Sequence, residues 1–169
     1  MSDTATPIPS LADRVRPIDA GAPVVGVHFF GSVPVFVLGE EALLFAARDG
    51  EPRRVAIHAG GILASASDGK GIVTGGDDGK LIATDANGDP TELAADDKKR
   101  WIDQIALGSD GAVAWSAGKV AHVLTKKGEA RSHEAPSTVA GLAFAPKGFR
   151  LAIAHYNGVT LWFPNASAT

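Results

Sequence analysis

The stretch IVTGGDDGKLIATD, residues 72–85, has two short apolar runs on either side of the polar segment GGDDGK. Glycine after aspartate is favoured where a tight turn needs a positive φ, because glycine has no Cβ that would clash. Apolar runs of this length, joined by such a turn, are typical of antiparallel strands. We therefore expect a β-hairpin whose turn lies at Asp78-Gly79.

The segment GGDDGK also has the residue types that two kinds of binding loop use. A calcium loop of the EF-hand type needs alternating acidic residues, a glycine and a terminal glutamate. Here Asp77 and Asp78 are adjacent, and no glutamate follows at the required distance. A phosphate loop needs a glycine five residues before Gly-Lys and a serine or threonine after the lysine. Thr74 and Leu81 occupy those two positions, so the segment favours a turn over either site.

The turn glycines recur with a period of about 40 residues, which is typical of repeat proteins built from small sheets. They form three interlocked series: Gly39, Gly79, Gly118 and Gly158; Gly50, Gly88 and Gly128; and Gly69, Gly111 and Gly148, preceded by Gly31. Each period divides into short strands between turns. The sequence therefore predicts an all-β protein of four-stranded antiparallel blades, with material for four blades. We expect units at about 24–50, 53–90, 91–130 and 131–165, after an N-terminal extension over residues 1–23.

Composition sets the outer limits of function. The 169 residues are 45% hydrophobic and 21% charged, as in a soluble globular protein. A net charge of −3 gives no electrostatic reason to expect a nucleic acid or an anionic membrane as partner. There is no cysteine, which excludes disulfides and thiolate metal sites. We see neither a secretory signal nor an apolar stretch that could span a bilayer, so we expect a cytoplasmic protein.

The second and fourth units resemble WD repeats. In the second unit, Thr74 takes the usual serine position, Asp78-Gly79 the turn, and Thr84-Asp85 the Trp-Asp pair, while His58 lies where the family carries its histidine. The fourth unit has LAFAPKG, Asn157-Gly158, Trp162 and His133 at corresponding places. Thr84 and Phe163 depart from the motif, and the third unit has neither the histidine nor the Trp-Asp pair.

This resemblance implies a β-propeller and a structural hydrogen-bond network. The network would join His58, Thr74 and Asp78, with His133 and Trp162 as the corresponding residues of the fourth unit. It would fix the loop between adjacent blades and would not be catalytic. The resemblance also implies a scaffold without a cofactor, which binds a protein partner through loops on one rim.

The best local indication of partner contact is the basic and aromatic cluster KKRW, residues 98–101. Tryptophan and arginine are enriched at interface hot spots because each covers a large area and keeps a polar group. We therefore predict Lys99, Arg100 and Trp101 as partner-binding residues. The loop Pro136, Ser137 and Thr138 joins them as a second candidate element of the same rim.

An enzyme, or a binder of a small ligand or metal in a polar central channel, is the alternative function. His155 or Asp103 would contribute in that case. The sequence has no Gly-x-Ser-x-Gly motif, and no two of its five histidines have the spacing of a ligand pair. We therefore expect no catalytic residue, no metal site and no cofactor.

Four units are few for this family, whose rings usually have seven or eight blades. The fourth unit lacks an outer strand, which residues 11–20, LADRVRPIDA, could supply. Three arrangements agree with this number of units. The chain is half of a longer propeller, which we favour; or it pairs with a copy of itself to complete an eight-bladed ring; or it closes alone as four blades.

Overall fold

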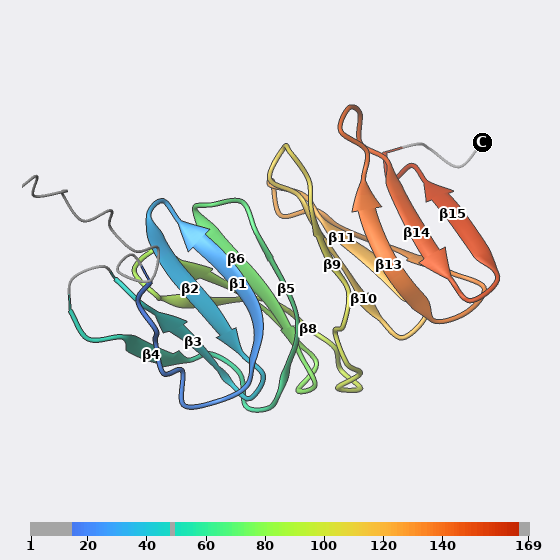
Figure 1. Ribbon diagram of the computed structural model, residues 1–169. Coiled ribbons are helices and arrows are strands. Elements are labelled where there is room, and N and C mark those ends of the chain that lie inside the picture. The colour runs from blue at the N-terminus through green and yellow to red at the C-terminus, as the bar shows by residue number, and fades with distance from the viewer. Residues whose placement is uncertain (1–14, 48–49, 166–169) are drawn as a thin grey trace, which may run out of the picture.

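The computed structural model describes residues 15–47 and 50–165, which form fifteen β-strands and no helix. This confirms the all-β prediction. Each strand pairs with its neighbour in the chain, so the strands make four antiparallel sheets that follow one another from the N-terminal to the C-terminal end (Figure 1). No helix that could cross a membrane occurs in this part of the chain.

The four sheets are numbered here in chain order. Sheet 1 contains β1 (Val24–Phe30), β2 (Val33–Leu38), β3 (Ala42–Phe45) and β4 (Arg53–Ala56). Sheet 2 contains β5 (Ile62–Ser67), β6 (Gly71–Gly76), β7 (Lys80–Asp85) and β8 (Pro90–Ala95). Sheet 3 contains β9 (Ile105–Leu107), β10 (Val113–Ala117), β11 (Val120–Leu124) and β12 (Ala130–Glu134). Sheet 4 contains β13 (Val139–Phe144), β14 (Leu151–His155) and β15 (Gly158–Trp162).

These boundaries correct the expected units. The expected unit 53–90 included residues 53–56, but these form β4, which pairs with β3 through Ala42 and Ala56 and so belongs to sheet 1. In the same way β8 and β12 close sheets 2 and 3. The divisions between units therefore lie later in the chain than the turn glycines suggest, in the connections that follow each outer strand.

Most of the turn glycines have the backbone conformation that the pattern predicts. Positive φ angles occur at Gly31, Gly50, Gly69, Gly79, Gly88, Gly111, Gly118, Gly128 and Gly148. Gly39 and Gly158 differ, because neither has a positive φ. Gly158 opens β15, and the Gly39 N–H donates to the Pro23 carbonyl at 2.8 Å.

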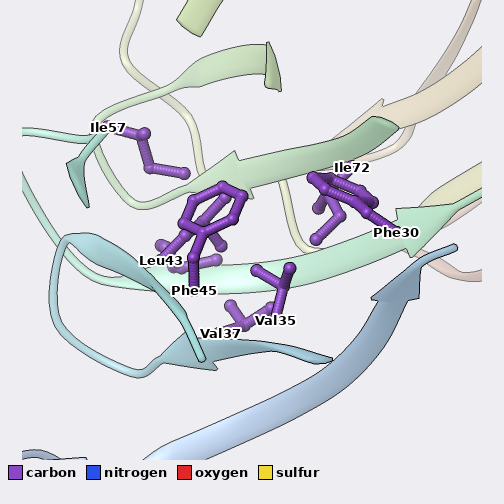
Figure 2. Packing of buried hydrophobic residues seen from close by; sticks show 8 residues of the cluster. Phe30, Val35, Val37, Leu43, Phe45, Ile57 and Ile72 are labelled. Atoms are coloured by element: carbon purple, nitrogen blue, oxygen red, sulfur yellow. The ribbon is translucent and has the colours of Figure 1, made fainter. Parts of the chain in front are cut away.

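Apolar faces join each sheet to the next. In Figure 2, Val35, Val37, Leu43 and Phe45 of sheet 1 pack in one cluster with Ile72 of sheet 2. A second cluster joins Val73 and Leu81 of sheet 2 to Trp115 of sheet 3, and a third joins Ala114 and Val123 of sheet 3 to Leu151 and Ile153 of sheet 4. The core is therefore a row of three sheet-to-sheet junctions.

The first strands of successive sheets contact one another, β1 with β5, β5 with β9 and β9 with β13. Sheets 1 and 4 lie at opposite ends of the row (Figure 1), and no core cluster of the described residues joins them. The row is therefore not closed. Residues 15–23 form no strand; Ile18, Ala20 and Ala22 pack on Leu38 and Leu44 of sheet 1 instead. Residues 11–14 of the expected closing strand lie outside the described residues.

Candidate functional site

One end of the molecule gathers the sheet-to-sheet connections and one hairpin turn from each sheet. We call it the connection rim: connections 57–61, 96–104 and 135–138, with the turns 39–41, 77–79, 118–119 and 156–157. Each connection bonds to the turn of the sheet it leaves. The N–H groups of Ile57, Asp96 and Ala135 donate to the carbonyls of Glu41, Gly79 and Lys119, each at 2.8 Å. These bonds hold the loops of the rim at fixed positions on the sheets.

A buried hydrogen-bond network underlies the first of these connections. The His58 Nδ1 lies 3.0 Å from Asp78 Oδ1, and its Nε2 lies 3.0 Å from the Thr74 hydroxyl. The Ala59 N–H donates to Asp78 Oδ2 at 3.1 Å, and the Lys80 N–H donates to Oδ1 at 3.0 Å. The structure thus brings together the connection (His58, Ala59), the middle of β6 (Thr74) and the β6–β7 turn (Asp78).

Asp78 carries a negative charge in this largely buried position. Burial raises the pKa of the Asp78 carboxyl, but hydrogen bonds from the Ala59 N–H, His58 and the Lys80 N–H outweigh burial and hold this pKa below its usual value. An ionised carboxylate can only accept hydrogen bonds, so the facing Nδ1 of His58 carries a hydrogen. Asp78 therefore orders the turn and the connection.

Thr84, His133 and Trp162 lie elsewhere. The Thr84 hydroxyl is buried and has no hydrogen-bond partner among the described residues, so it takes no part in the network. His133 belongs to β12 of sheet 3, and its ring stacks on Trp162 of sheet 4, with 5.7 Å between centroids. The expected second network is thus replaced by an aromatic contact between two sheets. His133 faces a neighbouring sheet because it lies within a strand, whereas His58 lies beyond the end of β4.

The KKRW cluster forms a compact loop around Asp96. The Asp96 carboxylate accepts from the N–H groups of Lys98 and Arg100 at 3.0 and 2.9 Å, and from the Arg100 guanidinium at 2.6 Å. Bonding to Arg100 lowers the pKa of Asp96 to about 2. The carboxylate therefore stays ionised and fixes both the backbone and the arginine of the loop. Lys98 and Lys99 form no ion pair within the described residues.

The loop also rests on the β6–β7 hairpin turn. Lys99 has a φ of 51°, and a Cβ added to Gly79 would lie 2.7 Å from the Lys99 Cα. Beyond it, Ile102 is fully buried while Trp101 is 63% exposed. A large aromatic ring is thus held in solvent by a backbone that is anchored on both sides.

Tyr156 is a rim residue that we did not predict from the sequence. It lies on the β14–β15 turn, is 88% exposed, and its N–H donates to the Ser137 hydroxyl at 3.0 Å. This bond places Tyr156 beside the predicted loop of Pro136, Ser137 and Thr138, of which Pro136 and Thr138 are exposed. The available signal was the only tyrosine of the chain standing in the turn sequence YNG.

The residues named for a catalytic or ligand-binding channel are not brought together. Asp103 accepts a hydrogen bond from the Ser116 hydroxyl at 3.3 Å, within sheet 3 and its connection. His155 lies in sheet 4, with its Nε2 3.3 Å from the Thr160 hydroxyl. Within residues 15–47 and 50–165, no group of three His, Asp or Glu side chains is arranged to hold a metal ion.

A groove of about 380 Å³ lies between sheets 2 and 3, at the end opposite the connection rim. Asp68 and Asp85 line it, but both carboxylates accept hydrogen bonds from N–H groups of their own turns. These acids stabilise the turns, as Asp side chains commonly do. The groove has an apolar floor of Val73, Ala83 and Val113, and Lys70, Asp89 and Thr91 also line it.

Replacing Asp96 by asparagine tests what holds the Trp101 loop. We expect a loss of about 1 kcal/mol in the free energy of unfolding at pH 7, because Asn cannot form the ion pair with the partly exposed Arg100. The folded-state pKa of about 2 is below the unfolded value, so the ionised carboxylate stabilises the protein above about pH 4 and loses this effect as the pH falls towards 2. Urea titrations of both proteins should therefore differ at pH 7 and converge near pH 2. A constant difference would contradict this role.

The comparisons with known proteins concern the fold. No family model matches the chain, and no curated protein matches it. The crystal structure of the computationally designed Ika4 protein is similar, with a TM-score of 0.70 and 19% identity over 86% of this chain and 93% of that chain. The designed Ika8 protein has a TM-score of 0.71 and 19% identity over 85% of this chain. The matched region spans 46% of the Ika8 chain, just under half of its length.

Proposed function

We propose that this protein is a non-catalytic, WD-repeat-like β-propeller scaffold that binds a protein partner through its connection rim. The observation that carries the proposal is Trp101, a tryptophan 63% exposed to solvent on a loop anchored by Asp96 and Gly79. A solvated indole on a rigid backbone can be buried in a partner with little loss of conformational entropy. The propeller architecture is supported by the contacts between successive first strands and by the repeated sheet-to-sheet junctions.

The rim supplies the other features of a protein-binding surface. Lys98 and Lys99 are exposed on the Trp101 loop, and Tyr156 is exposed on the last turn of the same rim. Protein interfaces commonly have aromatic residues at their centre and polar residues around the edge. The 96–104 connection has no net charge, but Lys98 and Lys99 offer two exposed cationic groups to acidic side chains of a partner.

Alanine at Trp101 should weaken partner binding about 30-fold, the effect of losing a hot spot of about 2 kcal/mol. The experiment is quantitative capture from cell extract, with the bound proteins compared between wild type and Trp101→Ala. Tyr156→Ala is the second rim variant. The control is the double variant Lys126→Ala, Lys127→Ala, which removes exposed cations from the β11–β12 turn at the opposite end.

A partner that is lost with Trp101→Ala and retained by the control would support the rim. Circular dichroism should show that each variant keeps its β-sheet content. If the folded Trp101→Ala protein retains every captured protein at the wild-type level, the rim is not the binding surface.

A further inference from the structure

Sheets 1, 2 and 3 each pack one face against the next sheet in the chain, and the side chains on this face occupy equivalent positions in the three sheets. We call this the forward face. Its central cross-strand pairs are Val35 with Phe45, Val73 with Ala83, and Ala114 with Val123. Residues directly opposite on paired strands lie on the same face of the sheet. Each pair belongs to the core cluster that joins its sheet to the following one.

Sheet 4 has the same forward face, but nothing in the described chain covers it. The equivalent pairs are Ala152 with Leu161 and Ala154 with Val159. Leu161 is 67% exposed and Val159 is 65% exposed, whereas Val123 at the equivalent place in sheet 3 is fully buried. An apolar surface built like three buried ones, and left open, indicates a missing neighbour.

Sheet 1 has an uncovered apolar surface on its opposite side, which we call the backward face. In sheets 2 to 4 this face packs on the preceding sheet. In sheet 1 its members are Phe36 and Pro34 of β2, with Val27 and Phe29 opposite them on β1. Val27 and Phe29 are 54% and 56% exposed. The segment around Ile18 packs on the Leu44 cluster, which Phe36 also contacts, and leaves Val27 and Phe29 open.

The side chains of the two open faces are also complementary in size. At the junction of sheets 3 and 4, the forward face contributes small residues, such as Ala106 and Ala114, and the backward face contributes large ones, such as Phe144. The open forward face likewise contains Ala143 and Ala152, which border a hollow of about 280 Å³. Phe29 holds the position in sheet 1 that Phe144 holds in sheet 4, before the turn that ends the first strand. A phenylalanine ring therefore suits the hollow.

We propose that a second copy of this chain covers both faces. The forward face of sheet 4 in each copy packs on the backward face of sheet 1 in the other, which gives two identical junctions and a closed pair of eight sheets. The faces lie at opposite ends of one chain (Figure 1), so they cannot meet within it. A two-fold symmetric pair satisfies both faces at once, whereas an unrelated partner would have to supply both complements.

The Ika8 structure supports an assembly of about twice the size of this chain. The same arrangement of sheets forms 93% of Ika4 and only 46% of Ika8, so it also occurs as about half of a longer chain. In sheet 4 of the present chain, β15 also has no strand beside its outer edge among the described residues. The proposal depends on these sheet faces and not on the connection rim, so loss of Trp101-dependent binding would leave it unaffected.

The mass of the protein in solution tests the proposal. Light scattering should give twice the chain mass of 17.3 kDa, or about 35 kDa, over about a hundredfold range of concentration. Leu161→Asp and Phe29→Asp place a charge in the junction and should each give 17.3 kDa. The control Tyr156→Asp changes an 88% exposed aromatic residue on the rim and should keep the doubled mass. A wild type of 17.3 kDa, open-ended larger species, or a dimer unaffected by both junction variants would overturn the proposal.

Cross-linking gives an answer that does not depend on the folding of charged variants. Since the chain has no cysteine, Val27→Cys and Ala143→Cys introduce thiols on the two open faces alone. A short bis-maleimide should convert the double variant, and a mixture of the two single variants, to a covalent dimer on a denaturing gel. Each single variant alone should stay monomeric on that gel. A double variant that yields no covalent dimer would overturn the proposal.

Discussion

Alanine in place of Gly79 is expected to lower the free energy of unfolding by about 3 to 5 kcal/mol, because two penalties coincide at this position. Gly79 has a φ of 76°, which strains any residue with a Cβ. The new Cβ would also lie 2.7 Å from the Lys99 Cα and 3.1 Å from the Lys99 carbonyl carbon. Backbone atoms cannot rotate away as a side chain can, so the whole Trp101 loop must shift.

Gly69→Ala is the matched control for this substitution. Gly69 lies on the β5–β6 turn with a φ of 82°, and a Cβ there would meet nothing within 4 Å. Its replacement should cost about 1 to 2 kcal/mol, the left-handed backbone penalty alone. Urea denaturation of both variants measures the difference. Equal losses at the two positions would show that the loop does not press on the β6–β7 turn.

Removal of the Asp78 carboxylate should cost about 3 kcal/mol, since Asp78→Ala leaves buried donors without an acceptor. His58 Nδ1, the Ala59 N–H and the Lys80 N–H all bond to this side chain. The His58 side chain is fully buried, so its Nδ1 donor has no access to bulk water. The variant is expected to loosen the connection between sheets 1 and 2.

Asp77→Ala provides the control beside it, because this neighbouring acid is exposed. Its replacement should change the free energy of unfolding by less than about 0.5 kcal/mol. The pH dependence adds a second test. The Asp78 pKa is lowered in the folded state, so its stabilisation is present above about pH 4 and is lost as the pH falls through the folded value. The gap between wild type and Asp78→Ala should therefore narrow in acid, and a gap independent of pH would contradict a role for the ionised carboxylate.

The all-β fold was predictable because its determinants are local. Turns at Asp68-Gly69, Asp78-Gly79 and Asn87-Gly88 each need a glycine with positive φ, and their spacing records the order of the strands. The meeting of His58, Thr74 and Asp78 was also expected, through residues that are far apart in the chain. That contact was predicted from the resemblance to WD repeats and not from the local sequence.

Other features depend on which surfaces meet, and the sequence does not show this. Val123 and Leu161 occupy equivalent places in similar strands, yet one is fully buried and the other is 67% exposed. The difference arises only because a sheet follows sheet 3 and none follows sheet 4 in the described chain. His133 and Trp162 were likewise placed in one unit, although β12 pairs with β11 and brings the histidine to a junction between sheets.

The exposure of Tyr156 escaped prediction for a similar reason. Tyr156 lies on the two-residue turn between β14 and β15, where its side chain is 88% exposed, and the local sequence does not show which sheet surfaces lie near that turn. The 96–104 connection was easier to predict from the sequence, because residues Lys98 to Trp101 interrupt the alternation of apolar and polar residues.

The three tryptophans are intrinsic fluorescence reporters of three separate regions. Trp101 is in solvent on the rim, Trp115 is 6% exposed at the junction of sheets 2 and 3 and stacks on His122, and Trp162 stacks on His133 between sheets 3 and 4. Variants that keep one indole at a time would give spectra that follow each region alone. Unfolding of this repeated structure could thus be followed junction by junction with light.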